Sequence, residues 1–204
     1  MHAAYPEDRG PLGLIAGEGQ FPLLVAQGAK RLGRETVGIA FKDYTRPELS
    51  MLAEHVTWLR LGQLSKMLAY FKRHQVREVV FAGGINKPRA LDMRPDLRAA
   101  RLLFQVRNRN DNSLLQAVAT LLESEGLTPI SPLEFVPFLR TPAGILTKRE
   151  PTRQERADIA FGWPMAQEIG RMDIGQCIVV RDQMVIAVEA IEGTNEVIRR
   201  AGMA

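Results

Sequence analysis

A glycine-rich loop that directly follows an apolar stretch is the first feature of this sequence that could do chemistry. The segment reads LGLIAGEGQFP over residues 12–22. Its loop residues are Gly17, Glu18, Gly19 and Gln20. Glycines let a ligand approach the backbone, and the N-terminus of the following helix offers N–H groups and a positive dipole end to phosphate. The segment predicts an anion-binding turn, and a tight strand-to-helix turn without a ligand is the alternative.

A second pair of glycines follows another apolar run, in the segment VVFAGGINKP. Its candidate binding residues are Phe81, Ala82 and Gly83. In the usual doubly wound strand order, this turn lies beside the first loop at the carboxyl edge of the sheet, where ligands bind. Lys87 and Arg89 would reach into the same crevice, although surface exposure is the commoner fate of such cations. The two glycine segments therefore predict one shared crevice.

Asp111 and Asn112 stand directly before the most regular helical pattern of the chain, in the segment NDNSLL. Short polar side chains at this place commonly cap the N-terminus of a helix. The same residues could instead present their oxygens to a ligand hydroxyl or a metal ion. Spacing does not separate the two interpretations, so both stay open.

Polar residues also gather on both sides of a predicted β-hairpin near the C-terminus. The candidates are Asp173, Gln176, Glu192, Gly193 and Thr194, in the segments RMDIGQ and VIAVEAIEGTN. Glu189 lies inside an apolar strand pattern, and a carboxylate in such a place usually has a partner. The pattern predicts a polar group at one end of a small sheet, and a structural ion pair of Glu189 is the alternative.

Other familiar catalytic and cofactor patterns are missing from the sequence. Neither G-x-G-x-x-G nor a P-loop is present, and no acidic residue ends the second predicted strand, which disfavours NAD. His2, His55 and His74 are isolated, without the spacing of metal ligands. No G-x-S-x-G elbow occurs, and Cys177 in the run CIVV reads as a buried apolar residue. Hydrolysis by a catalytic triad or by zinc is therefore not supported.

The elements that must position these residues follow an alternating pattern. Short β-branched runs alternate with stretches of helical period, which is typical of βαβ units around a parallel sheet. The predicted strands are Gly13–Ala16, Thr36–Ile39, Val56–Leu59, Glu78–Phe81 and Leu127–Ile130. The predicted helices are Pro22–Leu32, Gln63–Lys72 and Ser113–Glu125. Gly33 and Gly126 follow two of them, where a left-handed residue ends a helix. The predicted fold class is α/β, a Rossmann-like parallel sheet followed by a small, incomplete α+β domain.

A proline-rich stretch divides the chain. We predict a Rossmann-like nucleotide-side domain over 1–131, a crossover over 132–152 and a partial α+β domain over 153–204. The elements predicted for the last are a helix at Arg153–Ile169 broken at Gly162 and Pro164, a hairpin of Cys177–Val180 and Met184–Ala190, and a helix at Asn195–Arg200 capped by Thr194. So few elements make a poor core, and they need the first domain, a partner or further sequence. Hairpin pairing between two copies predicts a homodimer.

Composition limits the class of protein. The 204 residues are 46% hydrophobic, enough for an ordinary core, and a single cysteine excludes a disulfide framework, which fits a reducing cytoplasm. No apolar run reaches the ~20 residues of a membrane span, and the N-terminus does not resemble a signal peptide. The net charge of +4 comes from scattered arginines, which argues against a nucleic-acid groove. A solvated basic face is the simple interpretation, and a phosphate-bearing ligand or an acidic lipid surface is compatible with it.

Together and in this order, the five quoted segments resemble one family closely, the UDP-2,3-diacylglucosamine pyrophosphatases of lipid A synthesis called the LpxI family. The resemblance runs from Leu12 to Arg200. It implies a cytoplasmic, Mg²⁺-dependent hydrolase that converts UDP-2,3-diacylglucosamine to UMP and 2,3-diacylglucosamine 1-phosphate, with peripheral contact at the inner membrane. It also implies a pocket between the two domains, in which the glycine loop and the FAGG turn hold the nucleotide and phosphate side.

Two departures from the family pattern accompany this resemblance. Asn195 stands where the family motif reads EGTD, which removes one carboxylate. The aspartate regarded as catalytic in the family falls beyond Ala204, so the resemblance assigns no catalytic residue here and predicts a truncated C-terminus. Without carboxylates to hold Mg²⁺ and a water, binding would remain without efficient hydrolysis. A non-catalytic nucleotide-sugar or lipid-phosphate binding module, and a protein-interaction role without a small ligand, are the alternatives.

Overall fold

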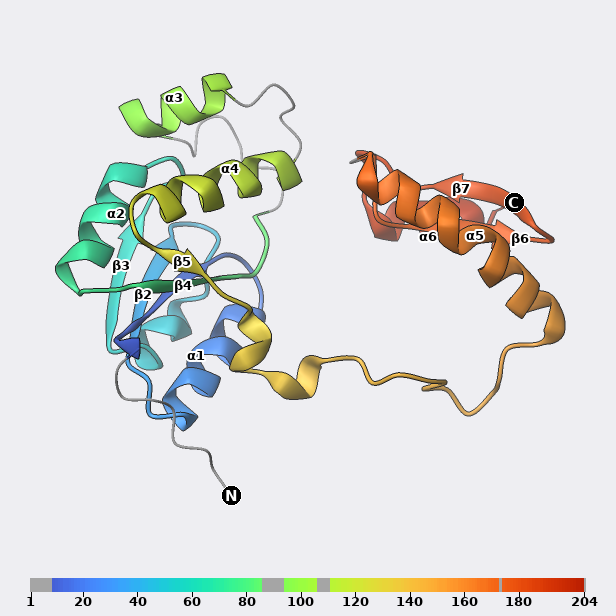
Figure 1. Ribbon diagram of the computed structural model, residues 1–204, viewed down its shortest axis with the longest axis horizontal. Coiled ribbons are helices and arrows are strands. Elements are labelled where there is room, and N and C mark those ends of the chain that lie inside the picture. The colour runs from blue at the N-terminus through green and yellow to red at the C-terminus, as the bar shows by residue number, and fades with distance from the viewer. Residues whose placement is uncertain (1–8, 86–93, 106–110, 173, 204) are drawn as a thin grey trace. The chain divides into compact units, whose positions relative to one another are not determined.

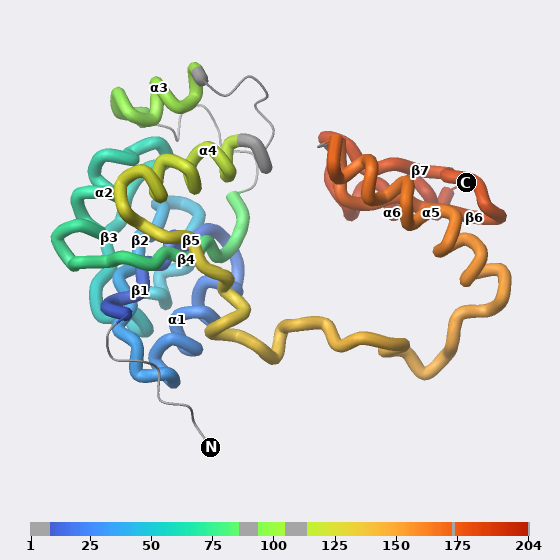
Figure 2. The backbone as a smooth tube through the Cα atoms, in the orientation of Figure 1, coloured from blue at the N-terminus to red at the C-terminus, as the bar shows by residue number. Residues whose placement is uncertain are grey.

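The computed structural model describes residues 9–85, 94–105, 111–172 and 174–203 (Figure 1). Contacts between residues divide the chain into two compact units, Met1–Thr141 and Pro142–Ala204. Figure 2 shows the path of the backbone through both, and each unit is described by itself. No helix among the described residues is long and apolar enough to cross a membrane.

A five-stranded parallel sheet forms the centre of the first unit. Its strands are β1 (Leu12–Ala16), β2 (Thr36–Phe41), β3 (His55–Leu59), β4 (Glu78–Ala82) and β5 (Thr128–Pro129). Their order is β3-β2-β1-β4-β5. Every residue of β1 and β2 is buried, as expected of parallel strands covered on both faces. All five predicted strands are present, and the α/β fold class is confirmed.

Helices cover both faces of this sheet. They are α1 (Phe21–Arg31) on one face, and α2 (Leu64–Arg73) and α4 (Asp111–Ser124) on the other. A further helix, α3 (Leu97–Gln105), packs on α2 and α4. One buried cluster joins α1 to alternate residues of β1, such as Leu12 and Leu14, and a second joins α2 and α4 to Ile15 and its neighbours. In Figure 1, α1 and α4 accordingly lie on opposite sides of β4. Gly33 and Gly126 have positive φ angles of 71° and 83°, as predicted for residues that end helices.

Helix α3 is absent from the sequence prediction. The backbone N–H of Ala99 donates a 3.0 Å hydrogen bond to Asp96 Oδ1, so Asp96 caps its first turn. A second oxygen of the same carboxylate accepts a 2.6 Å bond from the N–H of Ser65, at the start of α2. A single aspartate therefore fixes the beginnings of two helices.

The predicted crossover over 132–152 is shared between the two units. Its first part forms two short 3₁₀ turns, η4 (Pro132–Glu134) and η5 (Pro137–Leu139), and buries Phe135 and Val136 against α1. The backbone of Phe135 approaches Gly28 so closely that a Cβ on Gly28 would lie 2.0 Å from its carbonyl oxygen. These turns belong to the first unit, and the chain from Pro142 onward belongs to the second.

The second unit consists of α5 (Arg153–Arg171), the antiparallel strands β6 (Ile178–Arg181) and β7 (Met184–Val188), and α6 (Thr194–Ala201). The predicted break at Gly162 and Pro164 is wrong, because α5 is continuous through both residues. Proline removes one backbone hydrogen bond without ending this helix. A Cβ on Gly162 would lie 2.7 Å from Val180 Cγ2, so the glycine instead allows β6 to pack against α5.

The predicted cap of α6 is also wrong. Gly193, with a φ of 86°, occupies the N-cap position, and Thr194 is the first helical residue. Glycine is accepted at an N-cap, and its freedom at positive φ suits this turn. The fully buried apolar part of the unit is small, with Ala187, Val197 and Ala201 at its centre.

Candidate functional site

The two predicted glycine segments meet at the carboxyl edge of the sheet. Strands β1 and β4 pair in parallel with Ala16 opposite Ala82, so the loop after one lies beside the turn after the other. The N–H of Gly17 donates a 2.8 Å hydrogen bond to the carbonyl oxygen of Ala82. The N–H of Glu18 donates a 2.7 Å bond to the carbonyl oxygen of Gly84. The predicted proximity of the segments is confirmed.

Packing between the segments explains two of the glycines. A Cβ on Gly17 would lie 2.4 Å from the carbonyl oxygen of Gly84, and one on Gly83 would lie 2.4 Å from that of Glu18. Gly83 also has a φ of 80°, a conformation that favours glycine. These two residues are required by the fold, whether or not a ligand binds.

Gly19 differs, because a Cβ there would meet no atom within 4 Å, although its φ of 85° favours glycine. It is exposed beside the start of α1, where Gln20 occupies the N-cap position without a side-chain capping bond. Among the described residues, the N–H groups of Gly19, Gln20 and Phe21 have no backbone acceptor. Helix α1 carries no acidic side chain in its first turn. An anion would therefore be held at Gly19–Phe21, since the N–H groups of Gly17 and Glu18 are already used.

Phe81 and Ala82 contribute through the backbone. The Phe81 side chain packs against the cluster beneath α2 and α4, while Ala82 is buried in the cluster beneath α1. The carbonyl oxygen of Ala82 receives the bond from Gly17. Both residues thus support the loop, and their contact with a substrate stays a prediction.

Thr45 shapes the same edge of the sheet, and the sequence analysis missed it. Its side-chain oxygen accepts a 2.8 Å bond from the N–H of Phe41. Its hydroxyl donates to the carbonyl oxygen of Ala16, immediately before the glycine loop. Thr45 is 6% exposed, and it thus ties the turn after β2 to the end of β1. A lone threonine in a turn carries no sequence signal for this contact.

Several predicted residues have no described side chain. Lys87, Arg89 and Asp173 lie outside the described residues. Asp111 and Asn112 begin α4, but the structure describes only their backbone. Their roles remain predictions.

Glu189 organises the predicted polar group of the second unit. Glu189 Oε2 accepts a 3.0 Å bond from the N–H of Gln176, and Oε1 accepts a 2.8 Å bond from the Thr194 hydroxyl. A Cβ on Gly175 would lie 2.1 Å from the carbonyl oxygen of Glu189. The segments before and after the hairpin are therefore brought together as predicted. Within the described part of the chain, Glu189 meets these neutral donors, so the structural ion pair considered as its alternative is not found.

Glu192 and Gly193 lie in the turn between β7 and α6. Glu192 pairs with Arg200 of α6 at 2.7 Å, and the Arg200 guanidinium also donates to the carbonyl oxygen of Val188. Gly193 caps α6. These contacts build a fixed turn between β7 and α6.

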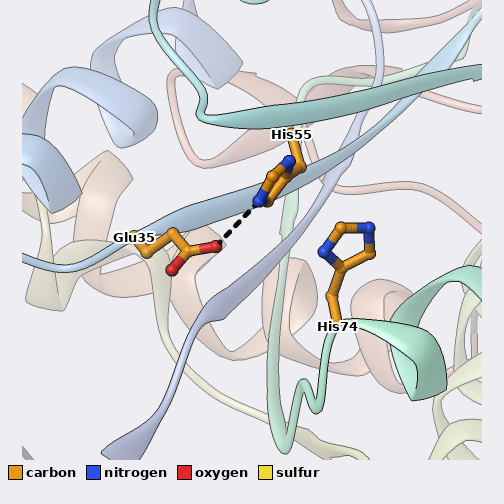
Figure 3. Close-up of side chains that lie close together, drawn as sticks. All are labelled: Glu35, His55 and His74. Carbon is orange, nitrogen blue, oxygen red and sulfur yellow. Dashed lines mark ion pairs between the residues drawn. The ribbon is translucent and has the colours of Figure 1, made fainter.

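The expectation that the histidines are isolated is wrong for two of them. His55 and His74 have ring centroids 4.3 Å apart, and Glu35 Oε1 lies 3.3 Å from His55 Nε2 (Figure 3). Among the described residues, these three form the one group of at least three His, Cys, Asp or Glu whose ligand atoms converge. The residues come from separate segments, so no local spacing announces them. They lie at the amino edge of the sheet, opposite the glycine segments.

The described residues do not fit the Mg²⁺ site that the resemblance implies. Mg²⁺ prefers oxygen ligands, whereas the converging group contains two imidazoles. Glu189 uses both oxygens in structural hydrogen bonds, and Glu192 is paired with Arg200. No step of a mechanism is therefore derived through Mg²⁺.

The fold and these contacts define an α/β protein of the Rossmann-like type, with two glycine segments joined at the carboxyl edge of its parallel sheet. Residues 11–139 match the family model described as the LpxI N-terminal domain, and residues 142–204 match the LpxI C-terminal domain. The chain belongs to the LpxI family.

One curated relative is similar over almost the whole chain. It is the UDP-2,3-diacylglucosamine pyrophosphatase LpxI of Caulobacter vibrioides, 32% identical over 192 residues. The match covers 93% of this chain and 68% of that protein. The sequence prediction of the family, and of an enzyme family, is confirmed.

Solved structures show more distant likeness. A biotin carboxylase domain of a thermophilic 2-oxoglutarate carboxylase is 15% identical with a TM-score of 0.37, over 59% of this chain and 22% of that one. The biotin carboxylase domain of a single-chain bacterial carboxylase is also 15% identical, with a TM-score of 0.36, over 78% of this chain and 34% of that one. Likeness at this level carries no functional argument.

Proposed function

We propose that the chain acts in lipid A synthesis as a UDP-2,3-diacylglucosamine pyrophosphatase, releasing UMP and 2,3-diacylglucosamine 1-phosphate. The observation that carries this proposal is the match to the Caulobacter enzyme of that name across 93% of the chain. Both family domains are present in order, which supports the assignment. The proposal includes a cytoplasmic location and contact with the inner membrane face, where a diacylated substrate would reside.

The glycine loop would bind the pyrophosphate side of this substrate. The N–H groups of Gly19–Phe21 and the N-terminus of α1 supply the donors and the positive dipole end that a phosphate needs. No catalytic residue is assigned within the chain, and Asp111 and Asn112 remain candidates for contacts with the substrate hydroxyls.

An apolar groove in the second unit would take an acyl chain. It has a volume of about 730 Å³ and is lined in part by Ile145, Leu146, Ile159 and Trp163. The side chains of Leu146 and Trp163 are each 63% exposed, so the groove offers apolar surface to a ligand. Burial of this surface against hydrocarbon favours binding by about 25 cal/mol per Å².

Matched variants test the groove. Ile159→Asp changes a residue that lines it and is 57% exposed, whereas Ile198→Asp changes a residue of α6 that is 56% exposed and outside it. Ile159→Asp should raise the KM for UDP-2,3-diacylglucosamine and leave UMP affinity unchanged. Equal effects of the two variants would contradict the acyl assignment.

A UMP-release assay tests the reaction itself. The chain is incubated with UDP-2,3-diacylglucosamine, and UMP is followed by ³¹P NMR in the presence of Mg²⁺ and again after addition of EDTA. Turnover that EDTA abolishes supports the pyrophosphatase and the Mg²⁺ requirement that the family resemblance implies. UMP binding in calorimetry without turnover supports a non-catalytic nucleotide-sugar binding module instead, and absence of both contradicts the uridine-nucleotide assignment.

Oligomeric state needs its own measurement. We propose a homodimer, because the second unit has a small core and exposes side chains such as Met184 and Val185 on β7. Sedimentation equilibrium of the chain distinguishes a dimer from a monomer directly.

A further inference from the structure

Three chain segments converge at the amino edge of the parallel sheet. Glu35 directly precedes β2, His55 is the first residue of β3, and His74 follows the last residue of α2. Gly17 and Gly83 follow the carboxyl ends of β1 and β4, at the other edge. Strands rise about 3.3 Å per residue, so a five-residue strand separates the two edges by roughly 15 Å. The cluster is therefore distinct from the proposed phosphate site.

The spacing of the ligand atoms suits a metal ion. The ligand atoms of Glu35, His55 and His74 all lie within 4.8 Å of one another. Zinc bonds to imidazole nitrogen and carboxylate oxygen are about 2.0–2.2 Å long, so two ligands of one tetrahedral ion are roughly 3.4 Å apart. Glu35 Oε1 and His55 Nε2 are 3.3 Å apart, close to that value. Figure 3 shows the imidazole of His74 beside that of His55, so a small side-chain rotation would complete the set.

The surroundings of His74 hold its ring in place. The ring of Tyr70 packs against it with centroids 4.6 Å apart and limits its movement. A side chain that packing already restrains loses little further rotamer freedom when it binds a metal ion.

We propose that Glu35, His55 and His74 bind one first-row transition-metal dication, with zinc as the ion of first choice. Two imidazoles and one carboxylate suit zinc, nickel or copper and are a poor set for Mg²⁺, which prefers oxygen. Three protein ligands leave one position for water. The bound ion would join the beginnings of β2 and β3 to the end of α2 and stabilise this edge of the first unit.

Calorimetric titration of ZnCl₂ into the full, tag-free chain tests this site. We expect one zinc per chain, and each of His55→Gln, His74→Gln and Glu35→Gln should weaken binding at least tenfold, since loss of an outer-shell partner alone costs about 10–100-fold. Glu123→Gln changes an exposed carboxylate of α4 and is the matched control, which should bind zinc as the parent does. MgCl₂ should produce no heat that depends on Glu35, His55 and His74.

Cobalt absorption and thermal unfolding separate loss of the metal site from loss of stability. The first reports metal coordination directly, and the second compares each variant with and without zinc. Co²⁺ should give intense visible bands in the parent chain, which indicate four- or five-coordination and are lost in the His74→Gln variant. Zinc should raise the unfolding temperature of the parent and of the Glu123→Gln control, and not that of the ligand variants. Zinc binding of parental strength in a chain that carries Glu35→Gln, His55→Gln and His74→Gln together, or equal loss of binding in the Glu123→Gln control, would overturn the proposal. Neither experiment uses the substrate, so the result is independent of the pyrophosphatase assignment.

Discussion

The carbonyl oxygen of Gly84 accepts a hydrogen bond from the N–H of Glu18, and it would lie only 2.4 Å from a Cβ on Gly17. The loop after β1 and the turn after β4 are thus one packed backbone unit. A side chain at Gly17 cannot be accommodated by rotation of a neighbour, because the obstruction is main chain. The position of the proposed phosphate donors at the start of α1 depends on this contact.

Gly17→Ala should therefore destabilise the first unit by about 1–3 kcal/mol, the usual cost of overpacking a dense interior. Denaturant unfolding measured by Trp58 fluorescence in a Trp163→Phe background reports this unit, since the chain has two tryptophans, one in each unit. UMP affinity should fall with it. An unchanged unfolding midpoint would show that the two glycine segments separate in solution.

Gly19→Ala should weaken UMP binding without the same packing cost. Gly19 and Gly33 both have positive φ angles and open space around the Cβ position. Each alanine should cost roughly 1 kcal/mol in backbone strain, so their unfolding curves should match. Gly33 lies at the far end of α1, so Gly33→Ala is the control for binding. Equal UMP affinities of the two variants would argue against an anion at Gly19–Phe21.

The strands and the meeting of the glycine segments were predictable because their signals are local. Buried parallel strands give short apolar runs, and doubly wound order then brings the ends of β1 and β4 together. Thr45 was not predictable, because its role depends on a hydrogen bond to Ala16, 29 positions away. The same holds for Gly28, which resembles a weak helix residue until the backbone of Phe135 is seen against it.

The proposed metal ligands and Pro164 show two other limits of prediction from sequence. Glu35, His55 and His74 come from three segments, so their proximity follows from tertiary packing and from no motif. Pro164 is a helix breaker by local preference, yet α5 runs through it because Gly162 packs on β6 and the helix has neighbours to hold it. Local preference was overridden in the second unit, where the sequence patterns are weaker.

Acid should weaken the first unit through Asp96. Burial raises the pKa of this carboxyl, but bonds from the N–H groups of Ala99 and Ser65 outweigh burial and hold it below its ordinary value of about 3.9. A carboxyl whose pKa is lowered by folding stabilises the folded state at pH values above its pKa in the unfolded chain. This stability is lost as the pH falls through its pKa in the folded chain. The unfolding free energy of the parent should therefore decline below about pH 4.

Asp96→Asn separates this effect from other acid sensitivity. The variant should lose about 1 kcal/mol at pH 7, because one amide arm presents a donor to an N–H of α2 or α3. It should also show a shallower decline in acid. Asp43→Asn, an exposed carboxylate of the same unit, is the control and should keep the slope of the parent. Parallel pH profiles of the parent and Asp96→Asn would contradict the assigned double cap.

Glu189→Gln should destabilise the second unit, because both carboxylate oxygens accept hydrogen bonds in a buried place. A glutamine can keep its oxygen on the N–H of Gln176 and turn its amide toward the Thr194 hydroxyl, which can rotate to accept. Both contacts then persist as neutral hydrogen bonds, which are weaker than bonds to a carboxylate, so the cost should be about 1 kcal/mol. Unfolding followed by Trp163 fluorescence in a Trp58→Phe background reports this unit. Thr194→Val should cost more, about 1–3 kcal/mol, because it leaves one buried carboxylate oxygen without a donor. A reversed order of the two variants would contradict the assigned contact between Glu189 and the Thr194 hydroxyl.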